Sequence, residues 1–345
     1  MFAYLSGTVL QRAATPILAN FNPPMISLHR IAHLTYTVLS DNPTKFPNNC
    51  GYILQFLGFI NELCVCNFYE KICCENVQFE ATQNWLVDMN FSLLIANELT
   101  KTYPITEYEY YDYSIQRIRH LYLIIRICLS SSILRPSFLI DELFDSMTRT
   151  MLRGNFVDSI ENERWEVLCL FYGDDTTELF RNIFGTIFNV VSDSITCVKR
   201  YHVAALTLLT LMLRKDRHIR PFLYSFNIHE VLLRLLLQFP DHTFLHNAII
   251  RFFKEALAFP EFSKSLIENL LNPLVLEGVN SEHTVLVGTS YECISLVLAE
   301  AKTNTDLINV LKDIPEFVKF VKDVVVDRIK LIKNGYGGRI QSIWG

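Results

Sequence analysis

The fold is decided by residues 227–259, which read NIHEVLLRLLLQFPDHTFLHNAIIRFFKEALAF. Asn227 and Glu230 have the spacing of a capping box, in which each side chain bonds the other residue's backbone amide, so a helix is predicted to begin there. Glu230 and Arg234 are expected to follow as an i,i+4 ion pair on the solvent side. The leucines between 232 and 237 cover too wide an arc for a surface helix. We therefore expect this helix to pack against neighbours on more than one side.

A second helix is predicted from Phe244 to Phe259, after Pro240-Asp241 ends the first one. Its apolar positions recur at three- and four-residue intervals, which places them on one face. These positions are Leu245, Ile249, Phe252, Phe253, Ala256 and Leu257. Two consecutive helices with apolar faces and a short break predict a buried seam between them.

The same alternation of apolar helix and short break extends along the chain, where Pro, Asn or Gly ends each helix. A loop rich in acid and tyrosine is expected over 107–113. Further helices are predicted at Gly51–Cys74, Trp85–Thr100, Ile115–Ser130, Ser137–Leu152, Thr176–Val191, Lys199–Leu213 and Glu316–Asn334, the last ended by Gly335. No strand pattern interrupts them. The fold class is therefore predicted as all-α, an irregular HEAT/armadillo-like α-solenoid of stacked helix pairs, in one continuous domain over 1–345.

The composition agrees with a buried helical protein. Of the 345 residues 50% are hydrophobic and 19% charged, which excludes a largely disordered chain. Glycine and proline number 12 each, few for an all-β protein rich in tight turns. The net charge of −5 provides no general attraction to nucleic acid.

Neither a membrane span nor a signal peptide is expected. The longest apolar runs are Val203–Leu213, which is short, and Val285–Ala299, which Glu292 interrupts. Both fall below the roughly 18–20 residues that a spanning helix needs. The start of the chain lacks the basic segment of a signal peptide. The 9 cysteines are an odd number and scattered, which indicates reduced thiols in a cytoplasmic protein, with the nucleus as a further compartment.

Cysteines and histidines are the candidates for a metal site. Cys64, Cys66, Cys73 and Cys74 cluster in sequence, with His29 and His33 as possible further ligands. On one helix, however, Cys64 and Cys66 point about 200° apart, whereas zinc needs all its sulfurs about 2.3 Å away. The pair His242 and His246 lacks the adjacent glutamate of a zinc-protease motif. We therefore expect buried apolar cysteines, no metal and no cofactor.

Signatures of an enzyme are weak throughout the sequence. No phosphate-binding loop or nucleophile elbow occurs. Asp174 and Asp175 follow Gly173 and are interpreted as acids at a helix N-terminus, which the helix dipole favours. The expectation is a protein without catalytic residues.

Charge is distributed unevenly over the middle of the chain. Residues 158–178 contain seven acids against Arg164 alone. Residues 199–220 are basic, with Lys199, Arg200, Arg214, Lys215, Arg217 and Arg220 against Asp216. One interpretation is a solvated rim of successive repeats, and the other is a docking ridge for a protein partner.

Residues 199–258 resemble the SAPS-domain family, the regulatory subunits of type 6 (Sit-four-like) serine/threonine protein phosphatases. The similar features are the helix that begins with Tyr201-His202-Val203 and ends at Leu213, the leucine-rich helix after Asn227, and the core motif Phe244-Leu245-His246. Asp241-His242-Thr243 departs from the paired asparagines of the family. The closing stretch at Pro315–Val318 and Asn334–Gly337 is also similar, although no tryptophan leads it. The usual aromatic-rich start and long acidic tail are missing, which suggests a divergent or trimmed member.

The resemblance implies a non-catalytic subunit that holds a type 6-like phosphatase catalytic subunit and directs it to substrates or to further scaffold proteins. Metals and catalytic water would then belong to the partner. Structural roles are expected for the motif residues. Phe244 and Leu245 are expected in the core, and His246 is expected to satisfy the end of a neighbouring helix. The candidate docking residues are Arg214, Lys215, Arg217 and Arg220, expected in an inter-helix loop before Pro221.

Two alternatives stay open. One is an unrelated helical-repeat scaffold or trafficking adaptor that binds peptides in its groove. The other is a hydrolase with an unfamiliar site, which would need activity from the purified chain alone.

Overall fold

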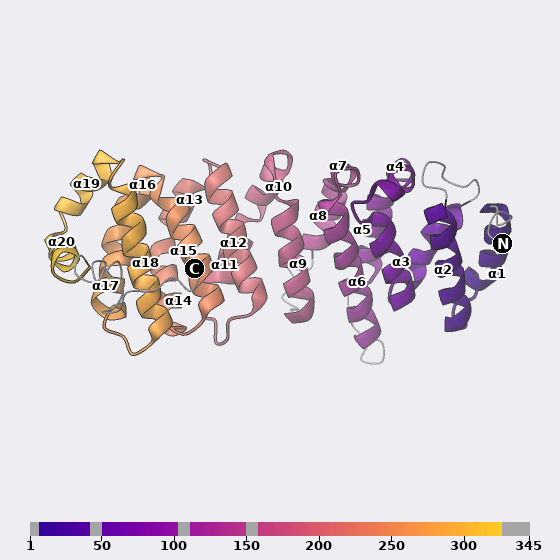
Figure 1. The fold of residues 1–345 in the computed structure, drawn as a ribbon, viewed down its shortest axis with the longest axis horizontal. Helices are drawn as coiled ribbons and strands as arrows, with labels where there is room; N and C mark the ends of the chain where they lie inside the picture. The colour runs from indigo at the N-terminus through magenta and orange to yellow at the C-terminus, as the bar shows by residue number, and fades with distance from the viewer. Residues whose placement is uncertain (1–6, 42–49, 103–110, 150–157, 326–345) are drawn as a thin grey trace, which may run out of the picture. The chain divides into compact units, whose positions relative to one another are not determined.

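The chain is helical throughout the part that the structure describes. This structure, a computed structural model, describes residues 7–41, 50–102, 111–149 and 158–325. Within these ranges every regular element is a helix and there is no strand, so the predicted all-α class is confirmed (Figure 1). The same ranges contain no helix long and apolar enough to cross a membrane. Contacts divide the chain into two compact units, residues 1–186 with 199–204, and residues 187–198 with 205–345.

The first unit contains two series of helices in mutual contact. In one series α2 packs on α3, α3 on α6 and α6 on α9; in the other α1 contacts η2, η2 contacts α5, and α5 packs on α8. The elements are α1 (Gly7–Leu18), α2 (Met25–Asp41), the 3₁₀ helix η2 (Gly51–Phe59), α3 (Leu63–Cys73), η3 (Val77–Phe79), α4 (Glu80–Asp88), α5 (Phe91–Thr102), α6 (Tyr111–Ser130), α7 (Arg135–Phe138), α8 (Asp141–Thr148), α9 (Asp158–Phe171), η6 (Asp174–Thr176) and α10 (Thr177–Asn182).

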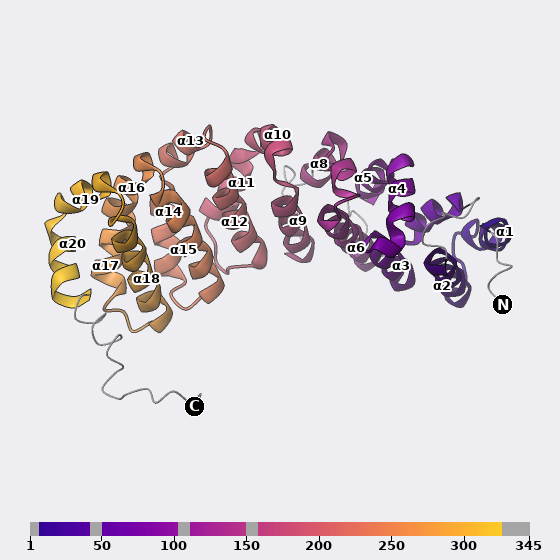
Figure 2. The same cartoon turned by 45° about the horizontal axis from the view of Figure 1, so that its top comes forward.

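The second unit repeats a short helix followed by two longer segments. In it α15 packs on α18, α14 contacts α17, and α16 contacts α19 (Figure 2). The elements are α13 (Arg220–Ser225), α14 (Ile228–Gln238), α15 (Thr243–Leu257), α16 (Pro260–Leu266), the π-helical η7 (Ile267–Leu271), α17 (Asn272–Gly278), α18 (Thr284–Glu300), α19 (Thr305–Lys312), α20 (Pro315–Phe320) and the π-helical η8 (Val321–Val325). The boundary between the units falls within α11 (Phe184–Ser192) and α12 (Arg200–Lys215). The single domain over 1–345 stays a prediction.

The predicted helix Gly51–Cys74 is wrong, because the segment consists of η2, a turn and α3. Side chains from other elements bond the carbonyls of the first half. Arg117 of α6 donates to Leu57 and Gly58 at 3.0 and 2.9 Å, and His120 contacts the Ile60 carbonyl at 2.7 Å. Carbonyls that are bonded in this way do not need the i+4 amides of a continuous α-helix.

Three other predicted helices are each two helices. Trp85–Thr100 is split at Asn90, whose φ of 52° is left-handed and ends α4 before α5 begins. Ser137–Leu152 is split at Ile140, which is extended, and residues 150–152 lie outside the described residues. Thr176–Val191 is split at Ile183.

The remaining predicted helices agree with the structure to within a few residues at the described ends. α6, α12, α14 and α15 match the predictions that begin at Ile115, Lys199, Asn227 and Phe244. α6 begins at Tyr111, so the loop predicted over 107–113 is wrong for its last three residues, and the others lie outside the described residues. The last predicted helix is observed as α20 and η8, and its residues 326–334 and Gly335 lie outside the described part.

The start of α14 differs from the predicted capping box. Asn227 is left-handed with φ 52°, and its side chain makes no capping hydrogen bond. Arg234 donates to the carbonyl of Ser192, so the predicted ion pair with Glu230 is replaced by a contact with the end of α11. The apolar face predicted for α15 is confirmed, because all six of its positions are buried.

Candidate protein-interaction surface

The predicted docking residues lie at the junction of α12 and α13. Arg214 and Lys215 form the last turn of α12, Arg217 lies in the turn that follows, and Arg220 begins α13. The predicted inter-helix loop is therefore shorter than expected and holds only Arg217 of the four. Basic residues in the last turn of a helix are stabilised by the negative end of its dipole, which explains the extension of α12 through Lys215.

Arg220 differs from the other three because it has partners inside the protein. Its guanidinium lies over the ring of Phe259, 3.5 Å from the ring centroid, and its Nε donates to the Leu213 carbonyl at 3.3 Å. The side chain is half-buried. These contacts join the end of α12 to the residue before α16, a structural role.

Arg214, Lys215 and Arg217 are the exposed cations of the junction. Arg214 is 52% exposed, and its nearest acid, Glu255 of α15, is 3.9 Å away, at the limit of an ion pair. Asp216 between them is buried, and it accepts a hydrogen bond from the backbone amide of His218 at 2.9 Å, which fixes the turn. The turn thus directs cationic side chains to solvent while its one acid lies inside.

Sequence reasoning missed the aromatic residues beside these cations. Phe222, Tyr224 and Phe226 are about half exposed, at 54%, 50% and 47%. Leu223 between them is buried, and it anchors α13 to the unit. The pattern Phe-Leu-Tyr-Ser-Phe after Pro221 is the signal that could have found them, since a helix this short cannot bury residues on all sides.

The family-motif residues at the start of α15 separate into one exposed and two buried side chains. Phe244 is 76% exposed, so its predicted core position is wrong, whereas Leu245 is buried as predicted. His246 is buried, and its ring nitrogens lie 2.9 Å from the Phe239 carbonyl and 2.7 Å from the Thr289 hydroxyl. Phe239 is the C-cap of α14, so His246 bonds the end of a neighbouring helix, as predicted.

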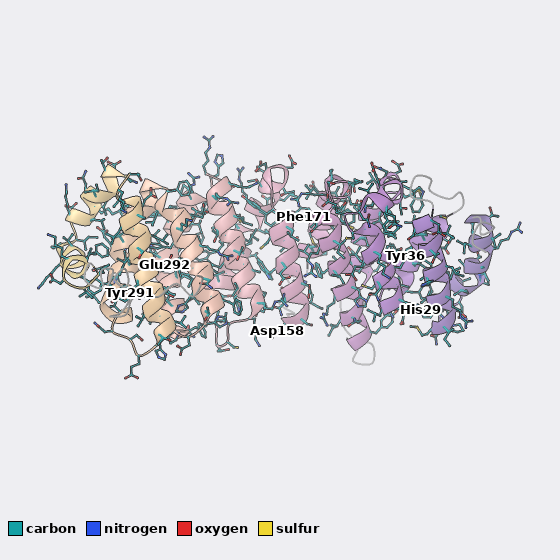
Figure 3. All side chains as sticks on the ribbon, viewed as in Figure 1. His29, Tyr36, Asp158, Phe171, Tyr291 and Glu292 are labelled. Atoms are coloured by element: carbon teal, nitrogen blue, oxygen red, sulfur yellow. The ribbon has the colours of Figure 1, made fainter. Side chains whose placement is uncertain are left out.

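The acidic stretch 158–178 and the first two basic residues of 199–220 neutralise each other within the first unit. Lys199 pairs with Asp158 at 3.0 Å, and Arg200 pairs with Glu166. Figure 3 labels Asp158, the first residue of α9 (Figure 3). Glu161, which is buried, pairs with Arg164 at 2.5 Å on the same helix. The acidic stretch is therefore held largely by internal pairs.

The cysteine and histidine candidates are distributed over different environments. Cys66 and Cys73 are buried in α3, Cys64 is half-buried and Cys74 is exposed. Burial raises the pKa of the Cys66 thiol to about 12, which disfavours the thiolate that binds metals. His29 and His33 of α2 line a groove with Cys64. Across the described ranges, no three or more His, Cys, Asp or Glu side chains lie close enough together to hold a metal ion.

Comparisons with known proteins give no family for this chain. No family model matches the sequence, and no curated protein matches it at a significant level.

Proposed function

We propose that the chain is a non-catalytic regulatory subunit, acting in the cytoplasm, that holds a type 6-like serine/threonine phosphatase catalytic subunit. The choice of partner rests on the sequence resemblance of residues 199–258. The observation that supports a binding role is the surface at the α12–α13 junction, formed by Arg214, Lys215, Arg217, Phe222 and Tyr224, which we term the junction surface.

An irregular HEAT/armadillo-like α-solenoid is the architecture that we propose for this subunit. In the second unit a short helix, α13 or α16, precedes two longer helical segments, α14–α15 or η7–α17–α18. Both short helices carry proline in their first turn. Their last helices end at Leu257 and Glu300, a spacing in the roughly 40–47-residue period of such repeats. The contacts of α15 with α18 and of α14 with α17 are those expected of stacked neighbours.

The chemistry of the junction surface favours an acidic protein partner. Exposed arginine and aromatic side chains are the types enriched at the energetic centres of protein interfaces. The cations Arg214, Lys215 and Arg217 would increase the rate of association with an acidic surface and make that rate sensitive to salt. The half-exposed rings of Phe222 and Tyr224 would supply the apolar area that such an interface buries.

The test is capture of the phosphatase subunit by the full chain with and without these cations. Reversing Arg214, Lys215 and Arg217 to Glu should leave the melting temperature nearly unchanged, because all three are exposed. Capture of a metallophosphatase catalytic subunit should weaken, most clearly at low salt. The control reverses three exposed lysines of the same unit, Lys254, Lys302 and Lys312, and should retain capture.

Two outcomes contradict different parts of the proposal. Capture that survives the triple reversal at both low and high salt would exclude the junction surface as the docking site. A pull-down that contains adaptor or cargo proteins and no metallophosphatase would exclude the phosphatase partner and favour an unrelated helical scaffold.

A further inference from the structure

A second surface in the first unit has the form of a binding groove. Side chains from one face of α2 and one face of α3 line it along about three helical turns. The lining residues are Met25, Ile26, His29, Ala32, His33 and Tyr36 of α2, with Leu63, Cys64, Asn67, Phe68 and Lys71 of α3. Figure 3 labels His29 and Tyr36 along α2.

The two helices run in the same direction along the groove. Met25 and Leu63, each the first residue of its helix, line the same end. At the other end the Lys71 ammonium lies over the Tyr36 ring, 4.9 Å from the ring centroid. Leu63 and Lys71 are thus separated by about 12 Å along α3. This separation gives the groove a defined polarity, with different chemistry at its two ends.

The end formed by the first turns is open and apolar. Ile26 is 66% exposed, Leu63 63% and Met25 49%, a concentration of exposed aliphatic side chains around a cavity of about 370 Å³. Exposed aliphatic side chains that gather around a depression are a candidate site for contact with a partner. This depression is open to solvent and lined mainly by apolar atoms, so aliphatic side chains of a partner can enter it from outside.

The other end is polar and carries positive charge. Its cavity of about 90 Å³ is lined by His29, His33, Asn67 and Lys71 as polar groups, and none of the groove's lining residues is acidic. The nearest acid to the apolar end, Glu62, accepts a hydrogen bond from Asn61 at 2.8 Å. Lys71 and the imidazoles can therefore donate to an incoming carboxylate without competition from an acid in the lining.

We propose that this groove binds an amphipathic helix of a partner protein. Its two aliphatic anchors, one turn apart, fill the apolar end beside Ile26 and Leu63, and a carboxylate seven or eight residues away pairs with Lys71. The spacing follows from the 1.5 Å rise per residue of an α-helix. Recognition of an apolar helix face by a groove is an established mode of peptide binding. This surface is separate from the junction surface and does not depend on it.

The experiment screens a phage-displayed library of random helical peptides against the full chain. Enriched peptides should share two aliphatic residues at i and i+4 and an Asp or Glu seven or eight positions from one of them. Ile26→Glu and Leu63→Glu should each reduce the affinity of a selected peptide at least about tenfold, because a charge replaces an apolar contact. The control Val77→Glu alters an aliphatic residue outside the groove that is even more exposed, at 84%, and should bind normally.

A charge exchange tests the polar end independently. Lys71→Glu should weaken binding of the selected acidic peptide by about fivefold. A peptide with Lys in place of its acid should recover that loss with Lys71→Glu and should bind the native chain poorly. Because Lys71 is exposed, the substitution should not affect folding, and circular dichroism checks this.

Three results would overturn the proposal. The first is an enriched set that binds Ile26→Glu as well as the native chain. The second is enrichment of basic peptides, which contradicts the role of Lys71. The third is concentration-dependent dimerisation of the native chain that Leu63→Glu abolishes, which would assign the groove to a second copy instead.

Discussion

The imidazole of His246 bonds the carbonyl of Phe239, the residue that ends α14, at a distance of 2.9 Å. The other ring nitrogen lies 2.7 Å from the hydroxyl of Thr289 on α18. One buried side chain thus connects three helices of the second unit. Burial lowers the pKa of His246, which favours the neutral ring. Its Nε2–H then donates to the Phe239 carbonyl, while Nδ1 shares the hydroxyl proton of Thr289 with the Val285 carbonyl, 2.9 Å from that hydroxyl.

His246→Leu should lower the free energy of unfolding by about 0.5–1.5 kcal/mol, since the Phe239 carbonyl loses the imidazole as a donor and keeps only the backbone amide of His242. His246→Gln should lose less, because an amide can replace one of the two hydrogen bonds. Urea denaturation monitored by circular dichroism measures both. Equal losses for the two variants would show that ring packing, rather than hydrogen bonding, is what His246 contributes.

Adjacent residues of the family motif should respond in opposite ways to the same substitution. Leu245→Asp places an unpaired charge in the seam of α15 and should cost several kcal/mol. Phe244→Asp alters a side chain that is 76% exposed and should change stability by no more than about 0.5 kcal/mol. Thermal melting of the two variants compares them, and similar midpoints would contradict the observed rotation of α15.

Periodicity predicted the elements whose structure depends on local pattern. The face of α15 from Leu245 to Leu257 follows from three- and four-residue spacing alone, and it is buried as predicted. Phe244 is exposed in spite of its hydrophobicity. It is adjacent to Leu245 and therefore points about 100° away from it on a helix.

Contacts between distant residues determined the breaks that the sequence did not predict. The segment after Gly51 is a 3₁₀ helix in which Arg117, about sixty residues later, bonds the carbonyls of Leu57 and Gly58. No local pattern contains that information. The break at Asn90 is different, because asparagine is among the few residues that adopt a left-handed backbone readily. The asparagine that follows Met89 was therefore a usable local signal that the helix ends there.

Replacing one partner of the buried pair Glu161 and Arg164 should destabilise the protein more than replacing both partners. Arg164 also donates to the Tyr122 hydroxyl at 3.1 Å, and Trp165 donates to Glu161 at 3.2 Å. Arg164→Met leaves a buried carboxylate without its cation and should destabilise the first unit by about 3–5 kcal/mol. The double variant Glu161→Leu/Arg164→Met should be more stable than Arg164→Met. A double-mutant cycle in urea measures the coupling, and a double variant less stable than either single one would contradict this expectation.

Acid should weaken the first unit through His202. Its Nδ1 accepts a hydrogen bond from the Lys199 backbone amide at 2.8 Å, so Nε2 carries the proton of the neutral ring. Burial lowers the pKa of this histidine to about 4. An unfolded chain binds a proton at that position below about pH 6.5, whereas the folded chain does not until about pH 4. Stability is therefore fully present above pH 6.5 and should fall, by on the order of 2–3 kcal/mol, as the pH decreases through this window.

His202→Gln separates this effect from general acid sensitivity. Glutamine at the third helical position can also reach back to the amide before the helix, so the cap is retained while the titrating group is removed. The loss of stability between pH 6.5 and 4 should be smaller in this variant than in the native chain. Urea midpoints at several pH values give both slopes. If native and His202→Gln chains lose stability in parallel, then His202 is protonated in the folded state and its burial does not govern the acid response.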